Sequence, residues 1–272
     1  MRQAMGAPPQ PPLPKPQTYV SLTFDDGDIT HRLAGDILRA HGMHGTFFVI
    51  TGFIDERNPY YLSWPQVQQL RREGNEIGGH TIGHVSLTDR KIPLKARREQ
   101  VCNDRRRLQQ MGMDARSFAY PEGAVDAVAK TLPKACGYQS ARTAGGVTPI
   151  GPLFAEAVPP MDPFETAALD NPEGTDLPGA ANRPAEPLTL DELRAAVVSA
   201  ATHTTDSVDG RWVQIVLHRV CASTDPLFLQ CMSSQSPIDD HTLTAFLDWL
   251  QHGAPAGTVV RTVGEVMDAS RR

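Results

Sequence analysis

Short strand-like segments alternate with helical patterns along most of this 272-residue chain. Residues 18–24 and 212–217 are enriched in β-branched and aromatic side chains, and residues 46–50 form a continuous apolar run typical of a buried parallel strand. Between these segments, apolar residues recur at helical spacing, as at Leu33, Ile37 and Leu38. The alternation predicts an α/β fold with a mostly parallel sheet, either a barrel or an incomplete barrel.

The predicted domain leaves out the start of the chain. Six of the first sixteen residues are proline, so residues 1–17 are expected to form an extended or disordered leader. The domain then covers residues 18–272, with one of its helices expected over 124–136. Two segments of weak periodicity, 145–187 and 221–237, are expected to be loop excursions rather than separate domains.

Composition excludes some classes of function. Lys and Arg number 26 against 31 Asp and Glu, and this net charge of −5 argues against nucleic-acid binding, which needs clustered positive charge. No stretch approaches the roughly 20 apolar residues of a membrane span. The four cysteines include no Cys-x-x-Cys pair. Cys221 and Cys231 flank a short loop and are the favoured disulfide pair, with four free thiols as the alternative.

Polar side chains follow three of the predicted strands, where catalytic groups of parallel α/β folds usually lie. Two histidines four residues apart, together with one carboxylate, can hold a metal ion and leave a position open for water. Each cluster alone also has a simpler explanation: a chance histidine pair, a turn, or a structural histidine. The clusters are Asp25 with Asp26, His80 with His84, and His218.

Four short motifs occur in the order found in one known family. Residues 23–27 read Thr-Phe-Asp-Asp-Gly and resemble the TFDDG motif of the polysaccharide deacetylases, also called the NodB-homology domain or carbohydrate esterase family 4. Residues 80–84 are similar to the family's H-S/T-x-x-H motif, residues 118–123 to its F-A-Y-P-x-G motif, and residues 217–218 to its late L-H motif. The resemblance is strongest over residues 18–142 and implies a distorted (β/α) barrel.

The resemblance implies a role for each matching residue. Asp25 would be the general base, while Asp26, His80 and His84 would hold a divalent metal, with zinc the expected ion. His218 would protonate the leaving amine. Such a metal would polarise the acetamide carbonyl, and a base and an acid together would give a bell-shaped pH profile.

Other positions match the family less closely. The oxyanion donor would be the backbone N–H of Glu122, which does not depend on the side chain. The arginine that steadies the base in many members is replaced by Ala119. Arg142 is the expected substitute, with a surface arginine as the alternative. The family's fourth motif is not evident, so no residue is assigned to support His218.

The implied function is metal-dependent N-deacetylation of glycans that contain N-acetylglucosamine: chitin, peptidoglycan or poly-N-acetylglucosamine. The alternatives are an O-acetyl esterase on xylan, a small-molecule amidohydrolase, and a carbohydrate-binding protein without activity. A glycan substrate favours an extracellular or cell-envelope location, although no signal peptide is visible. That location in turn favours two disulfides, Cys221–Cys231 and Cys102–Cys136. The sequence does not indicate the oligomeric state.

Overall fold

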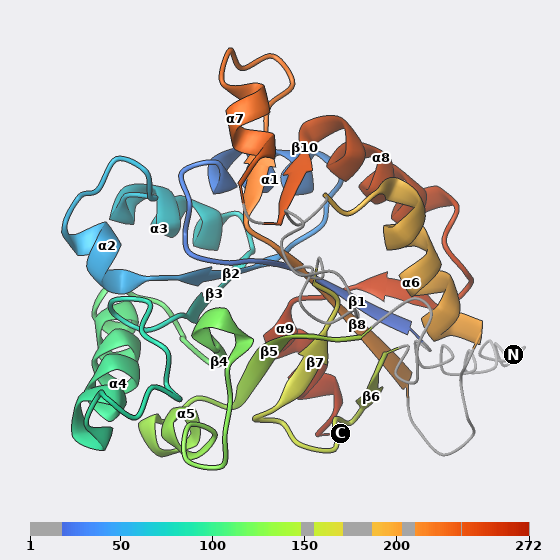
Figure 1. Cartoon of the computed structure of the whole chain (residues 1–272). Coiled ribbons are helices and arrows are strands. Elements are labelled where there is room, and N and C mark those ends of the chain that lie inside the picture. The colour runs from blue at the N-terminus through green and yellow to red at the C-terminus, as the bar shows by residue number, and fades with distance from the viewer. Residues whose placement is uncertain (1–17, 148–154, 171–186, 203–209, 235, 272) are drawn as a thin grey trace, which may run out of the picture.

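A curled, mostly parallel sheet forms the centre of the molecule in the computed structural model, which describes residues 18–147, 155–170, 187–202, 210–234 and 236–271 (Figure 1). The strand order is β6-β8-β1-β2-β3-β4-β5-β7, and β11 pairs with the first part of β1, on the edge that β2 pairs with further along. Only β6 runs antiparallel to its neighbour within this sheet. The strands are β1 (Thr18–Phe24), β2 (Thr46–Val49), β3 (Glu76–Gly79), β4 (Ser117–Ala119), β5 (Ser140–Gly146), β6 (Glu156–Val158), β7 (Thr166–Ala168), β8 (Gly210–Leu217) and β11 (Thr258–Val260).

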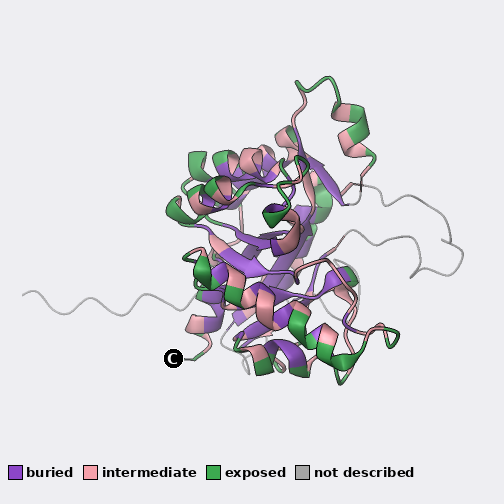
Figure 2. Cartoon of the chain, turned by 90° about the vertical axis from the view of Figure 1, so that its left-hand side faces the viewer, coloured by how far each residue is buried: buried purple, intermediate pink, exposed green. Residues whose placement is uncertain are grey.

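Helices surround the sheet (Figure 1), and a two-stranded sheet of β9 (Arg219–Cys221) and β10 (Pro237–Asp239) extends from it. Figure 2 shows the central strands buried and the outer faces of the helices exposed. The helices are α1 (His31–Ala40), α2 (Thr51–Asp55), α3 (Trp64–Arg72), α4 (Leu94–Gln110), α5 (Thr131–Cys136), α6 (Leu190–Thr202), α7 (Phe228–Met232), α8 (Asp240–His252) and α9 (Val263–Ala269), with a short 3₁₀ turn η1 (Pro121–Gly123).

One residue nearly closes the sheet into a barrel. After β7, the N–H of Leu169 donates to Gln214 O at 2.7 Å, and the N–H of Val216 donates back to Leu169 O at 2.9 Å. The side chain of Gln214 adds a hydrogen bond to Thr166 Oγ1 at 2.9 Å. These contacts join the two ends of the sheet, so the predicted α/β fold with a distorted barrel is confirmed.

Local sequence signals explain several helix boundaries. Ser63 begins α3 with a capping box, in which its side chain and that of Gln66 satisfy the free N–H groups of the first turn. Between the sheet and α1, the rings of Phe24 and Phe47 stack with centroids 4.7 Å apart and contact His31, and both are fully buried. Because these residues come from adjacent parallel strands, their packing sets β1 against β2.

The structure differs from the prediction of a helix over 124–136. Only Thr131–Cys136 is helical. Asp126 explains the difference, because its side chain accepts hydrogen bonds from the N–H groups of Val128 and Ala129 at 2.9 and 2.7 Å. Such a local turn competes with the hydrogen bonds that a helix would need.

The two predicted loop excursions also contain regular structure. Within 145–187, β6 and β7 join the central sheet, which a loop excursion would not do. Within 221–237, α7 forms a separate short helix between β9 and β10. The strands were missed because three residues are too few to show an alternating pattern. Residues 148–154 and 171–186 lie outside the described residues, as does the predicted leader 1–17.

Both predicted disulfides are confirmed. Cys102 of α4 is bonded to Cys136 of α5, and Cys221 of β9 is bonded to Cys231 of α7. Each bond therefore ties a helix to a neighbouring element. Within the described residues, every helix is too short or too polar to cross a membrane.

Candidate active site

The predicted site residues gather at the carboxyl end of the barrel. They come from five parallel strands, and all but Arg142 follow the end of a strand, so the barrel brings together positions that are far apart in sequence. Asp25 and Asp26 follow β1, His80 follows β3 and leads to His84, Glu122 follows β4, Arg142 lies in β5, and His218 follows β8.

Asp26, His80 and His84 form a compact cluster of potential metal ligands. One ligand atom from each lies within 4.8 Å of the other two. The Nε2 atoms of His80 and His84 are each 3.4 Å from Asp26 Oδ1. Two histidines and one carboxylate are a common donor set for zinc and related divalent metals, and three protein ligands leave room for water and substrate.

The hydrogen bonds around the cluster fit a bound cation. His80 donates its Nδ1–H to the backbone oxygen of Ala119 at 2.8 Å, so in the neutral ring Nε2 is the unprotonated nitrogen, and it faces Asp26. An unprotonated nitrogen and a carboxylate oxygen repel each other unless a cation lies between them. Asp26 Oδ1 is buried and has no hydrogen-bond partner within the described residues. The three residues therefore fit the predicted metal, although their role stays a prediction.

The backbone at the site is strained. Asp26, Thr81, His84 and Glu122 all have positive φ angles, of 76°, 67°, 53° and 60°. Side chains other than glycine rarely adopt this left-handed region, and such residues often cluster where function requires a particular geometry. Here the strain falls on two of the three candidate ligands and on the candidate oxyanion donor.

Asp25 is buried against Arg142. Its Oδ1 accepts a hydrogen bond from Arg142 Nη2, and both side chains are almost fully buried. Arg142 also lies over the ring of Phe48, 5.0 Å from its centroid. Burial raises the pKa of Asp25, but the positive charges around it, led by Arg142, outweigh burial and hold the pKa below its ordinary value. Arg142 thus reaches the predicted base, as a substitute for the family's arginine should.

His218 lies between β8 and β9, held by its backbone. Its N–H donates to Ser236 O at 3.1 Å, and its carbonyl oxygen accepts the Nε2–H of His31 at 2.6 Å. The ring borders the same cavity as Asp26.

Glu122 is exposed beside His84. Burial lowers the pKa of His84, and the charge of Glu122 raises it by less, so the pKa is lowered overall.

Sequence reasoning missed a carboxylate near His218. Asp170 follows Leu169, the residue that closes the barrel, and accepts a hydrogen bond from Ser236 Oγ at 3.0 Å. Burial raises the pKa of Asp170, and the charge of His218 lowers it, so the two groups interact. The only sequence signal for this residue was its position shortly after the three-residue strand β7, and that strand lies in the segment 145–187, which was predicted to be a loop.

A cavity of about 240 Å³ opens beside these groups. It is large enough for part of a sugar ring with its substituents. Tyr61 offers an aromatic surface next to the polar groups. The residues that border the cavity are Asp26, Asp28, Tyr61, His218, Arg219 and Ser234.

Comparison with known proteins finds similarity to one family over the first half of the chain. Residues 13–141 match the polysaccharide deacetylase family. The chain resembles this family over that segment. It is 34% identical over 134 residues to a peptidoglycan-N-acetylglucosamine deacetylase of Bacillus cereus, a match that covers 47% of this chain and 57% of that protein. This chain therefore spans just over half the length of that relative.

Solved structures of deacetylases and esterases share the fold over nearly the whole chain. A peptidoglycan N-acetylglucosamine deacetylase in complex with a benzamide ligand is 18% identical, with a TM-score of 0.54 over 94% of this chain and 89% of that one. A family 4 acetyl xylan esterase from Clostridium thermocellum, in complex with a cobalt ion, is 15% identical, with a TM-score of 0.51 over 92% and 91%. At these identities the likeness shows the polysaccharide deacetylase fold alone.

Proposed function

We propose that this chain is a metal-dependent N-deacetylase that hydrolyses acetamide groups of N-acetylglucosamine-containing glycans, with peptidoglycan as the first substrate to test. The proposal is carried by one observation: a three-residue metal-ligand cluster lies beside a buried Asp25–Arg142 pair and borders the cavity that His218 also lines. The Bacillus cereus relative favours peptidoglycan over chitin and poly-N-acetylglucosamine.

The residues divide the reaction into two proton transfers. A divalent metal, with zinc the expected ion, would be held by Asp26, His80 and His84, where it would polarise the acetamide carbonyl and acidify water. Asp25, kept ionised by Arg142, takes the proton of the attacking water. The N–H of Glu122 donates to the developing oxyanion.

The second proton transfer releases the amine. His218 donates a proton to the leaving nitrogen, so that the carbon–nitrogen bond breaks and acetate is released. Asp170, whose side chain accepts a hydrogen bond from Ser236 Oγ, lies close enough for its charge to interact with that of His218.

The cysteines support an extracellular or cell-envelope location. Both pairs are bonded, and structural disulfides persist in oxidising compartments.

Acetate release tests the proposal. The protein is incubated with peptidoglycan, with N-acetylglucosamine oligomers and with acetylated xylan, first as purified, then after chelation, and then after zinc is restored. We expect release from at least one N-acetylated glycan, its loss on chelation and its return with zinc. The Asp25→Asn variant should bind zinc but release acetate about 10²–10⁴-fold more slowly. Release from xylan alone would show an O-acetyl esterase, and release unaffected by chelation would refute the metal-dependent mechanism.

A further inference from the structure

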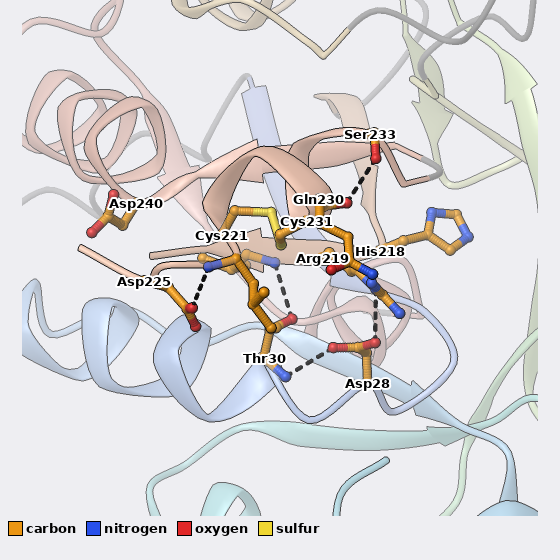
Figure 3. Close-up of a disulfide and its surroundings, with 12 residues drawn as sticks. Asp28, Thr30, His218, Arg219, Cys221, Asp225, Gln230, Cys231, Ser233 and Asp240 are labelled. Atoms are coloured by element: carbon orange, nitrogen blue, oxygen red, sulfur yellow. Dashed lines mark hydrogen bonds and ion pairs between the residues drawn. A yellow bond between two sulfur atoms is a disulfide. The ribbon is translucent and has the colours of Figure 1, made fainter. Parts of the chain in front are cut away.

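Arg219 brings a positive charge into the cavity that holds the proposed reaction. It directly follows His218 in the chain, and both side chains border the cavity together with Asp26. Figure 3 shows the Arg219 guanidinium and the His218 ring extending to the same side of β9. The proposed chemistry uses His218 and Asp26 but leaves Arg219 without a role.

A buried carboxylate fixes the orientation of Arg219. Its Nε–H donates to Asp28 Oδ2 at 3.0 Å, and Asp28 Oδ1 accepts the N–H of Thr30 at 2.9 Å (Figure 3). Asp28 is only 7% exposed, and both of its oxygens are engaged. The Arg219 side chain is 37% exposed, and its two terminal nitrogens have no hydrogen-bond partner in the described part of the chain.

The segment that carries Arg219 is held in place on several sides. The N–H of Val220 donates to Thr30 Oγ1 at 3.1 Å, and His31 holds the carbonyl oxygen of His218. The Cys221–Cys231 disulfide then ties the end of β9 to α7. A guanidinium fixed in this way loses little conformational freedom on binding a ligand, which strengthens binding.

We propose that Arg219 binds a carboxylate carried by the sugar next to its acetamido group, so that the enzyme prefers acidic glycans to neutral ones. A guanidinium with two free terminal nitrogens matches the two oxygens of a carboxylate. Of the candidate glycans, chitin and poly-N-acetylglucosamine offer no such group. Peptidoglycan does, because one of its two sugars carries a lactyl ether beside the acetamido carbon. That carboxylate is free only where no peptide is attached. The inference rests on the proposed deacetylase function.

Three substrates of matched length test the proposal. They are peptide-free peptidoglycan strands with free lactyl carboxylates, the same strands with those carboxylates converted to methylamides, and neutral N-acetylglucosamine oligomers. We expect the wild type to have a kcat/KM for acetate release about tenfold to a hundredfold higher for the carboxylate strands than for the methylamides, because hydrogen bonds between charged groups differ from neutral ones by about that factor.

Variants assign the preference to Arg219. Arg219→Gln should reduce the ratio of carboxylate to methylamide kcat/KM to near one. Arg219→Lys should leave an intermediate ratio, because lysine keeps the positive charge but lacks the paired N–H donors of a guanidinium. The control is Arg39→Gln, which removes an equal charge from the exposed end of α1, where the side chain is 62% exposed. It should keep the wild-type ratio.

The outcomes separate this inference from the proposed function. Equal kcat/KM for both kinds of strand, or a ratio unchanged by Arg219→Gln, would overturn the anion site while leaving a deacetylase. If no substrate releases acetate, calorimetric binding of the two kinds of strand to the chelated protein decides. Tighter binding of the carboxylate strands that is lost in Arg219→Gln would support the anion site and leave only the reaction refuted. Equal binding would overturn both.

Discussion

Individual charged residues at the site act through their neighbours. Arg142 is nearly fully buried and contacts Asp25, so its main effect falls on the ionisation of the predicted base. The sequence predicted this role, because Ala119 replaces the arginine of the family motif and Arg142 lies at the end of the next predicted strand. It could not show the contact itself, since Asp25 and Arg142 are 117 residues apart.

Replacing Arg142 should move the acidic limb of the pH profile. Arg142 lowers the pKa of Asp25, so Arg142→Gln raises that pKa and leaves the base protonated over a wider range. The acidic limb of the variant should therefore lie at a higher pH than that of the wild type. The measurement is kcat/KM against pH, with Arg142→Lys as the charge-preserving control. Identical limbs in all three proteins would show that Arg142 does not set this pKa.

A second buried carboxylate, Asp104 of α4, lies behind the site. It accepts hydrogen bonds from Thr51 Oγ1 and Tyr138 Oη, both at 2.9 Å. Burial nevertheless raises the pKa of Asp104 to about 7. Between about pH 4 and pH 7 the folded protein keeps a proton that the unfolded chain releases, so this group lowers the free energy of unfolding as the pH rises.

Asp104→Asn should remove that part of the pH dependence. Asparagine resembles the protonated acid at every pH. The wild type should lose up to about 4 kcal/mol in free energy of unfolding between about pH 4 and pH 7, and the variant should not. Urea unfolding at pH 5 and at pH 8 measures the difference for both proteins. An equal difference in the two would show that Asp104 is ionised throughout.

At the scale of elements, sequence patterns predicted long strands and helices well and short ones poorly. The strand 18–24 and the helical spacing of Leu33, Ile37 and Leu38 in α1 were recognisable because each shows a sustained pattern. The strands β6 and β7 were not, because only pairing with β8 and β5 makes three residues into a strand. Asp170 follows one of these short strands, so the sequence indicated the three candidate metal ligands but not Asp170.

Removing either disulfide should destabilise the protein, by different amounts. The Cys102–Cys136 bond closes a loop of 34 residues and the Cys221–Cys231 bond one of 10. Loop-closure entropy gives about 4 and about 3 kcal/mol respectively. Chemical unfolding of the two double Cys→Ser variants measures these losses. Loss of Cys221–Cys231 should also raise KM, because α7 and β9 adjoin the cavity, whereas loss of Cys102–Cys136 should not. An unchanged KM in both would contradict this.

At the scale of the whole molecule, a metal bound only by the folded state should stabilise it. With zinc at about 100 times its dissociation constant, the gain is about 3 kcal/mol, or roughly 5–10 °C in Tm for a chain of this size. His84→Ala should abolish the shift, whereas His252→Ala, an exposed histidine at the end of α8, should retain it. A zinc-dependent shift that survives His84→Ala would place the metal elsewhere.

The closure of the barrel at Leu169 separates the site into an early and a late half. Asp25, Asp26, His80 and His84 lie within 60 residues of one another and follow β1 and β3, which are separated in the sheet only by β2. Asp170 reaches His218 only after two hydrogen bonds join the segment after β7 to β8. The candidate metal ligands therefore depend on the first three strands, whereas the contact between Asp170 and His218 depends on the closed barrel. The proposed hydrolysis needs both.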